Sequence, residues 1–387
     1  FDRFVSILVF VPRDRYDSAA RDKIGNYLKT VFDGRLSAYY VAFPEGGLTR
    51  IHFIIGRTSG KTPKVDQATI ETAIRDMIRT WEDALADTAE ISGSAPGLKE
   101  IATRFPGSYR DSFTAAVALV DAERITRVDA EHPISIDYYR DTGQTATQAS
   151  LKIYHHGAPV ALSRRVPILE NIGFRVISER TFEIGGEPSG KVFIHDMELE
   201  SADGRPIALD DGGALFDDAF LAVWNGDVDN DGYNRLAQTA GLWASEIMVL
   251  RAYGRYLQQA GIPQSQDFIG ATLNRYPDIA RGLHALFVAL LGPDAAGEGG
   301  AVEARHLKVK IKDALDDVPN IDDDTIIRRF LNLIESSLRT NHFVAGKKDR
   351  GQSLAIKLDP RAIDGLPEPR PWREILVYGS EVEGVHL

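Results

Sequence analysis

Residues 4–11 read Phe-Val-Ser-Ile-Leu-Val-Phe-Val, a nearly continuous apolar run that predicts a strand buried on both faces. The elements predicted after it are a helix from Asp17 to Gly34, strands over 36–43 and 48–55, and a helix that opens at Asp66 and carries its apolar stripe to Leu85. The two strands flank a Pro-Glu-Gly-Gly turn, which is typical of an antiparallel hairpin. The start of the chain therefore predicts a small unit with the order βαββα.

The same order returns in outline further along the chain. Residues 93–133 predict a helical linker broken by Phe105-Pro-Gly-Ser-Tyr109. The elements predicted next are strands over 134–140 and 151–154, a helix that Ser163 caps and Gly173 closes, strands over 174–184 and 191–199, and a helix over 211–224. The two units lack obvious residue identity, so the sequence predicts a repeat of architecture.

An almost wholly helical pattern covers residues 227–343. The predicted helices are 233–260, 265–275, 277–291 and 322–338, with a flexible loop at the Ala-Ala-Gly-Glu-Gly-Gly stretch 295–300 and strands resuming only at Leu354. The fold class is α+β, in five parts: a domain over 1–92, a helical linker over 93–133, a second domain over 134–226, a helical domain over 227–345 and a β segment over 346–387. The abrupt start at Phe1 and the apolar end at Leu387 lead us to expect a piece of a longer polypeptide.

Composition excludes several classes of function. The net charge of −11 disfavours nonspecific nucleic-acid binding, which depends on cations that neutralise phosphates. No apolar run approaches the roughly 20 residues that cross a bilayer, so we expect no membrane partner. Cysteine is absent, which removes disulfides, thiolate catalysis and thiolate metal sites and agrees with a cytoplasmic protein.

Two acidic stretches suggest cation sites but have simpler explanations. Residues 227–232 read Asp-Val-Asp-Asn-Asp-Gly, the first half of a calcium loop, yet the twelfth position holds Gln238 in place of the bidentate glutamate. We therefore expect Asn230 and Asp231 to cap the next helix. Carboxylates 322–324 likewise precede a predicted helix, where they stabilise its dipole.

Histidines offer weaker hypotheses. His155 and His156 are adjacent, but no third metal ligand is suitably spaced, and side chains on a strand alternate between its faces. The pair does lie at a strand-to-helix loop of the second unit, a position that can face a ligand, although a structural or surface role is favoured. Arg50 and His52 alternate with apolar residues, so they occupy the sheet face opposite the core, solvated or covered by a partner. No dinucleotide fingerprint, P-loop, nucleophile elbow or zinc helix motif is present, and we predict no catalytic, cofactor or metal residues.

The βαββα order is that of the ACT-type regulatory module. Several longer stretches resemble the large bacterial NAD-specific glutamate dehydrogenases: residues 2–13, Tyr39-Tyr40, 48–55, 172–176 and Asn230-Asp-Gly-Tyr-Asn-Arg-Leu236. The closing motifs resemble the entry to that family's catalytic region: Lys357-Leu-Asp-Pro-Arg361, Pro367-Glu-Pro-Arg-Pro371 and Val382-Glu-Gly-Val-His-Leu387. The resemblance spans essentially the whole chain.

This resemblance implies two ACT-like, ferredoxin-like domains, a helical connector and the truncated start of a catalytic domain. The parent enzyme would oxidise L-glutamate to 2-oxoglutarate and ammonia with NAD, while this chain, lacking the catalytic lysine and NAD site, would be inactive. We expect a regulatory and oligomerisation role through contacts between its own subunits, with a possible amino-acid effector at the loop carrying His155, His156, Ala161 and Leu162. The alternative is a pure structural scaffold without effector binding.

Overall fold

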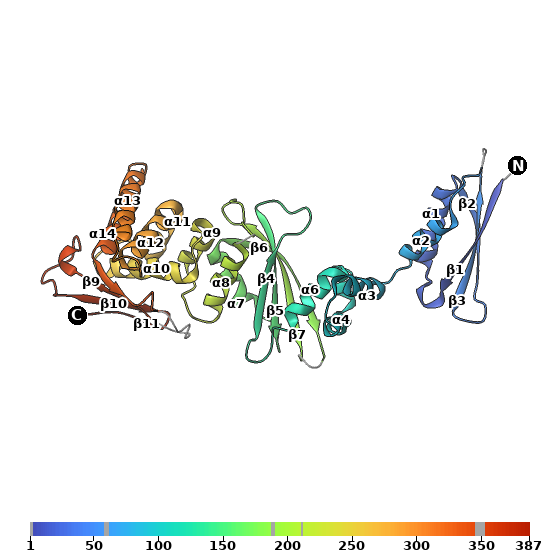
Figure 1. Cartoon of the computed structure of the whole chain (residues 1–387), viewed down its shortest axis with the longest axis horizontal. Coiled ribbons are helices and arrows are strands. Elements are labelled where there is room, and N and C mark those ends of the chain that lie inside the picture. The colour runs from blue at the N-terminus through green and yellow to red at the C-terminus, as the bar shows by residue number, and fades with distance from the viewer. Residues whose placement is uncertain (1–2, 58–61, 187–189, 210–211, 345–352) are drawn as a thin grey trace. The chain divides into compact units, whose positions relative to one another are not determined.

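The computed structural model describes residues 3–57, 62–186, 190–209, 212–344 and 353–387. The chain divides into two compact units, 1–127 and 128–387 (Figure 1). Each unit is described by itself, and both mix helices with antiparallel sheet, which confirms the α+β class.

The first unit begins with the expected βαββα order. Its elements are β1 (Phe4–Pro12), the short 3-10 helix η1 (Arg13–Arg15), α1 (Ser18–Val31), β2 (Arg35–Ala42), β3 (Leu48–Gly56) and α2 (Gln67–Met77). The three strands form an antiparallel sheet in the order β1-β3-β2. Asp17 and Asp66 cap the two helices, each accepting a backbone N–H three residues ahead, as expected. The core lies between the helices and one face of the sheet, where Val9, Phe53 and Leu28 are buried.

The prediction that β1 is buried on both faces is wrong. Val9 and Val11 are 6% and 1% exposed, but Leu8 and Phe10, on the opposite face, are 57% and 54% exposed. The helices cover one face only, because both α1 and α2 pack against the same side of the sheet. The continuous apolar run therefore reflects a strand that is apolar on both faces but buried on only one of them.

The helix predicted from Asp66 to Leu85 is two helices. The first ends at Met77, and a capping box formed by Thr80 and Asp83 starts α3 (Trp81–Ser92). The apolar stripe continues across the break because Leu85 is still buried, which hid the boundary from a periodicity argument. The remaining helices of the unit are α4 (Pro96–Ala102), α5 (Gly107–Arg110) and α6 (Ala115–Ile125). The break predicted at Phe105–Tyr109 is confirmed at Phe105 and Pro106 only, because Gly107–Tyr109 belong to α5.

The second unit opens with another βαββα module. Its elements are β4 (Ile134–Tyr139), β5 (Gln148–His156), α7 (Leu162–Ile172), β6 (Phe174–Ile184), β7 (Val192–Ser201) and α8 (Gly212–Trp224), with sheet order β4-β5-β7-β6. The module has one more strand than the first, because β4 pairs with β5 before the common order begins. The first strand after the first helix carries a β-bulge in both modules, between Leu36 and Ala38 and between Val176 and Ser178.

A helical block follows, with boundaries that differ from prediction in three places. Its elements are η2 (Gly232–Arg235), α9 (Leu236–Ala240), α10 (Ala244–Gln259), α11 (Gln266–Arg275), α12 (Pro277–Leu291), α13 (Glu298–Leu315) and α14 (Ile321–Glu335). The long helix predicted from 233 is interrupted at Gly241, which adopts left-handed geometry (φ 66°). The predicted flexible loop at 295–300 instead runs into α13, which begins at Glu298 despite two glycines in its first turn. Strands resume at β8 (Ser337–Thr340) rather than at Leu354, so the last predicted helix ends earlier, at Glu335.

Two helical glycines, Gly254 and Gly270, leave room for the ring of Tyr233. A Cβ on Gly254 of α10 would lie 2.1 Å from the hydroxyl of Tyr233, and one on Gly270 of α11 would lie 3.2 Å from its ring. Tyr233 is 1% exposed and donates to Gln266 at 3.1 Å. The ring can therefore enter between the two helices only because neither presents a side chain there.

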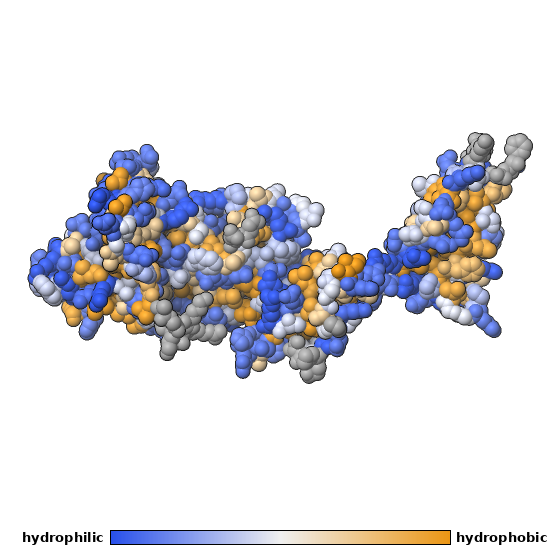
Figure 2. Space-filling model, in the orientation of Figure 1, coloured by the Kyte–Doolittle hydropathy of each residue, from blue (hydrophilic) through white to orange (hydrophobic). Residues whose placement is uncertain are grey.

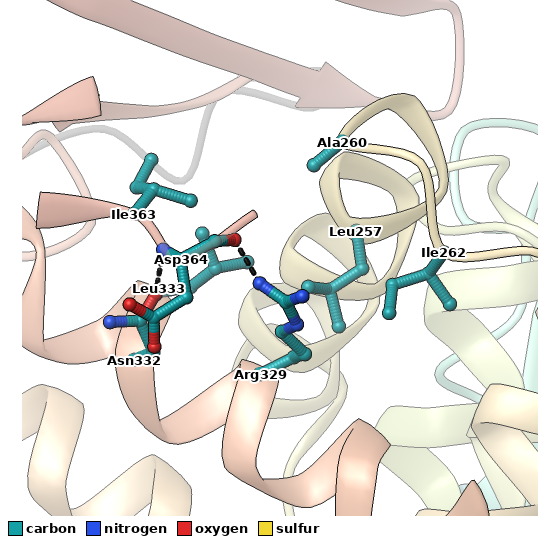
Figure 3. Close-up of a pocket in the computed structure, with 8 residues that line it drawn as sticks. All are labelled: Leu257, Ala260, Ile262, Arg329, Asn332, Leu333, Ile363 and Asp364. Atoms are coloured by element: carbon teal, nitrogen blue, oxygen red, sulfur yellow. Dashed lines mark hydrogen bonds between the residues drawn. The ribbon is translucent and has the colours of Figure 1, made fainter. Parts of the chain in front are cut away.

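The chain ends in a second sheet packed on this block, with β9 (Leu354–Leu358), β10 (Glu374–Gly379) and β11 (Val382–His386) in the order β11-β10-β9-β8. Figure 3 shows how the proline-rich connection between β9 and β10 is attached: Asn332 of α14 accepts from the Asp364 N–H at 2.9 Å, and Arg329 donates to the Asp364 carbonyl. The cavity beside them measures about 10 Å³, room for about one water. This contact is a structural joint, too small for an amino acid.

One hydrophobic core runs through the whole second unit, from Ile136 in β4 to Tyr378 in β10. None of the helices in the described ranges is both long and apolar enough to traverse a bilayer.

Candidate functional site

The loop between β5 and α7, residues 157–161, is held by its central peptide. Val160 is 6% exposed and packs into the core, while its N–H donates to Nε2 of His195 at 3.0 Å and its carbonyl accepts from Arg165. Because Nε2 accepts, the proton of His195 lies on Nδ1, which donates to Glu179 at 3.0 Å. Arg165 also pairs with Glu179, so one carboxylate orients both groups that hold Val160. We call Val160, Arg165, Glu179 and His195 the loop clamp.

Electrostatics keep the loop clamp in this protonation state. Burial, followed by the charge of Arg165, lowers the pKa of His195, which keeps the ring neutral and able to accept. Burial alone would raise the pKa of Glu179, but hydrogen bonds from Arg165 and then Thr181 outweigh it and bring that pKa below its usual range. A neutral imidazole between a buried cation and anion is thus the stable arrangement.

The residues that follow Val160 are exposed to solvent, whereas Val160 itself is buried. Ala161 and Leu162 are exposed, and Ala161 is the N-cap of α7, with no side-chain hydrogen bond to the free N–H groups of the first turn. The prediction that Ser163 caps this helix is wrong, because α7 begins at Leu162 and its N-cap is Ala161. Arg164 lies above the Trp224 ring at 3.5 Å. An uncapped helix start beside a cation suits a carboxylate.

The sequence placed His155 and His156 in the loop, but the structure shows them as the last two residues of β5, with separate surroundings. His155 donates from Nδ1 to the Ala158 carbonyl at 2.7 Å, and its ring meets Trp224 edge-on at 5.8 Å. Nε2 of His156 lies 3.3 Å from where a Cβ would stand on Gly190. His155 therefore shapes the loop from within, whereas His156 belongs to the other face of the strand.

We expect that replacing His195 with phenylalanine will destabilise the second unit by about 1–3 kcal/mol, because the buried Val160 N–H loses its acceptor. Hydrogen exchange should show the Val160 amide losing protection more than its neighbours in β5. His306→Phe, at an exposed position of α13, is the matched control and should change neither quantity. Unchanged protection of Val160 in the His195 variant would show that the loop clamp does not hold the loop.

A second polar cluster joins the helical block to the C-terminal sheet. Arg251 of α10 is fully buried and forms a two-pronged ion pair with Asp231, with N–O distances of 2.9–3.1 Å. Asp229 accepts from the Tyr378 hydroxyl of β10 at 2.6 Å and pairs with Arg255 at 3.4 Å. We call these five residues the polar joint.

The polar joint uses the carboxylates that resembled a calcium loop. Of the two expected caps, Asp231 caps η2 through the Tyr233 N–H at 3.0 Å and also pairs with Arg251. The Asn230 side chain accepts from Asn171 at 2.9 Å instead. Burial opposes the charge on Arg251, but the Asp231 carboxylate outweighs it and raises the pKa of the guanidinium. Burial and the bond to Asp229 likewise leave the Tyr378 hydroxyl protonated, with its pKa raised. Arginines thus occupy the oxygens that a cation would need.

Other contacts extend the same connection. Tyr256 of α10 donates to Glu374 of β10, and the Tyr253 hydroxyl lies 2.7 Å from that of Ser337 in β8. The acidic cluster 322–324 lies in the first turn of α14, as expected, but Asp323 is also 1% exposed and pairs with Arg275. Arg251 was not identified from the sequence. The available signal was that it is a charged residue on the apolar face of the helix that became α10.

Comparison with known proteins places these features in one family. Models described as the glutamate dehydrogenase ACT2 domain, ACT3 domain and helical motif 3 match residues 1–82, 133–211 and 228–293. A model of the bacterial NAD-glutamate dehydrogenase catalytic domain matches residues 310–387. The chain belongs to the bacterial NAD-glutamate dehydrogenase family.

Three curated relatives carry the name NAD-specific glutamate dehydrogenase. The chain is 36% identical to that of Halomonas elongata and 33% to that of Pseudomonas aeruginosa, in each case over its whole length and 24% of the relative's. The match to Mycobacterium tuberculosis is 32% identical over 99% of the chain and 25% of the relative. The chain therefore spans about a quarter of the length of the curated relatives it matches.

The family segments map directly onto the two clusters. The loop clamp lies wholly within the ACT3 match, since its members run from Val160 to His195. Asp231 and Arg251 belong to helical motif 3, whereas Tyr378 belongs to the catalytic-domain match. The polar joint therefore crosses a boundary between two family segments.

Proposed function

We propose that this chain is the regulatory and assembly portion of a cytoplasmic NAD-dependent glutamate dehydrogenase. The parent enzyme would oxidatively deaminate L-glutamate to 2-oxoglutarate and ammonia while NAD accepts a hydride. The match to ACT and catalytic segments in one chain is the observation that carries this proposal. Its own subunits are the proposed partners.

We assign NAD binding to other parts of the parent. A dinucleotide site needs a parallel β-strand–helix unit whose helix N-terminus receives the pyrophosphate. In the described ranges, every strand pairing of the three sheets is antiparallel. These residues do not fit the cofactor, so the proposed contribution of the chain is control and assembly.

The proposed effector site is the start of α7 with the loop before it. The free N–H groups after Ala161, the nearby Arg164 guanidinium and the exposed Leu162 would accept the carboxylate and the apolar side chain of an amino acid. His155 and His156 would line the approach. A signal from this loop has a physical route to the catalytic segment, because α7 contacts η2, which neighbours the polar joint. The alternative function is a scaffold whose ACT-like modules bind no effector.

A capping substitution tests the site. We expect one amino acid, at about a hundred times its dissociation constant, to stabilise the protein by about 2.7 kcal/mol and to raise its melting temperature by a few degrees. Ala161→Asp places a carboxylate on the same N–H groups, so it should stabilise the protein without ligand by about 1 kcal/mol and abolish the ligand shift. Ala95→Asp, at the equally uncapped start of α4, is the matched control and should keep the ligand shift.

Three other outcomes would count against parts of the proposal. A ligand shift that survives in Ala161→Asp would place the effector elsewhere in the chain. If no amino acid raises the melting temperature of the unaltered protein, the scaffold function is favoured. A shift with NAD would contradict the assignment of the cofactor to other parts of the parent.

A further inference from the structure

The uncovered face of the first sheet is an exposed, largely apolar surface. It is formed by alternate residues of the three strands: Phe4, Ser6, Leu8 and Phe10 of β1, Leu48, Arg50, His52 and Ile54 of β3, and Ala38, Tyr40 and Ala42 of β2. We call this surface the open face. The exposed fractions of its large apolar side chains are 61% for Phe4, 57% for Leu8, 54% for Phe10, 62% for Tyr40 and 46% for Leu48. Figure 2 shows hydrophobic residues gathered over these strands. A contiguous apolar surface of this kind marks an interaction site.

The charged side chains of the open face limit which kind of partner surface can pack against it. The open face carries Arg50 and His52 and none of its eleven residues is a carboxylate. His52 is satisfied within the face, since its Nε2 lies 2.8 Å from the Ser6 hydroxyl and its ring 6.1 Å from that of Tyr40. The partner must therefore present an apolar surface that accommodates one guanidinium, and the open face itself is such a surface.

The register makes the open face complementary to itself. Its central row is Leu8, His52 and Tyr40, side by side on the three strands. On one side of that row lie the bulky Phe10 and Arg50, and on the other the smaller Ser6 and Ile54. A twofold axis through the central row, perpendicular to the strands, places Phe10 over Ser6 of the second copy and Arg50 over its Ile54. Bulky residues then meet small ones, and the two Arg50 charges stay apart.

We propose that the open face packs against the same face of a second copy of this chain, with a twofold axis at His52. This inference rests on the assembly role proposed above and names its surface. Three strands of about eight residues present roughly 400 Å² per copy, since strands are spaced about 4.8 Å apart and rise about 3.3 Å per residue. That is about half of the roughly 800 Å² per partner in a standard interface, so the face alone gives a weak dimer that other contacts in the parent reinforce.

Sedimentation equilibrium of the full chain across a wide concentration range tests the dimer. We expect self-association that Leu8→Asp weakens at least tenfold, because two carboxylates then face each other across the axis. Ile91→Asp, at an 87% exposed position of α3, is the matched control and should leave association unchanged. Both side chains are exposed, so circular dichroism should show both variants folded.

The absence of native cysteine allows a test of the axis itself. His52→Cys should be linked to its copy by a short bismaleimide, since both thiols lie at the axis. Leu48→Cys should not, because the two copies of residue 48 would be about 26 Å apart along the strands. A chain that is monomeric at every concentration, or equal association of Leu8→Asp and Ile91→Asp, would overturn the proposal, and equal linking at positions 48 and 52 would overturn the axis. The amino-acid shift should persist in Leu8→Asp, so failure of the dimer is separable from failure of effector binding.

Discussion

Replacing Asp231 with alanine is expected to destabilise the second unit by about 3 kcal/mol, because it leaves the fully buried Arg251 guanidinium without its carboxylate. The same substitution removes the cap of η2, which adds to the loss. The estimate is at the low end for a broken buried pair, since the Asp231 side chain is still 21% exposed. Urea unfolding followed by tryptophan fluorescence, to which Trp224, Trp243 and Trp372 of this unit contribute, would measure it.

Two further variants establish the cause. Asp227→Ala, in the same loop, should change the free energy of unfolding by less than about 0.5 kcal/mol. Combining Asp231→Ala with Arg251→Met should cost less than Asp231→Ala alone, because no unpaired charge then remains in the core. Equal losses in the single and double variants would show that the cap, and not the ion pair, carries the effect.

Acid is expected to destabilise the helical block through the buried His284 and the half-buried His342. Burial lowers the pKa of His284 to about 4, and burial, then the neighbouring His284, lowers that of His342. Their rings lie 6.5 Å apart and both contact Phe287. Since the folded-state pKa is below the unfolded value of about 6.5, the unfolded chain binds more protons between these values. The stabilisation is thus complete above about pH 6.5 and falls as pH drops toward 4, by at most about 3 kcal/mol for His284.

Other groups also titrate in this range, so the measurement is a difference. The free energy of unfolding should be determined at steps from pH 7 to 4 for the unaltered chain and for His284→Gln. The variant should show a shallower loss on acidification, whereas His306→Gln, at an exposed position, should follow the unaltered protein. Parallel curves for His284→Gln and the unaltered chain would refute the role of His284.

Local patterns in the sequence predicted the modules well because each strand and helix end had its own signal. Asp17 and Asp66 cap the helices they were expected to cap, and the hairpin of the first module has the predicted strands. The failures lie where tertiary packing overrides a local pattern. Glu298 starts a helix next to two glycines because α13 packs along α12, a contact that no local signal reports.

The candidate site was predictable only in position. The loop at His155–Leu162 was identified from its place between a strand and a helix, and the structure shows how Val160 is held and Ala161 left open. The rest of the loop clamp comes from α7, β6 and β7. Pairing of β6 with β7 brings Glu179 and His195 together, and His195 reaches Val160 over 35 residues of sequence. The polar joint spans 149 residues between Asp229 and Tyr378, so its partners could not be paired from one sequence.

The polar joint also affects how the helical block and the C-terminal sheet unfold. Helical motif 3 and the catalytic-domain segment are separate in sequence, yet the side chains of Asp229, Tyr253 and Tyr256 each form a hydrogen bond across that division. Opening either segment alone would strip buried polar groups of their partners and expose the shared core. We therefore expect helical motif 3 and the part of the catalytic-domain segment in this chain to unfold as one cooperative unit, so that the boundary between them divides sequence families and not folding units.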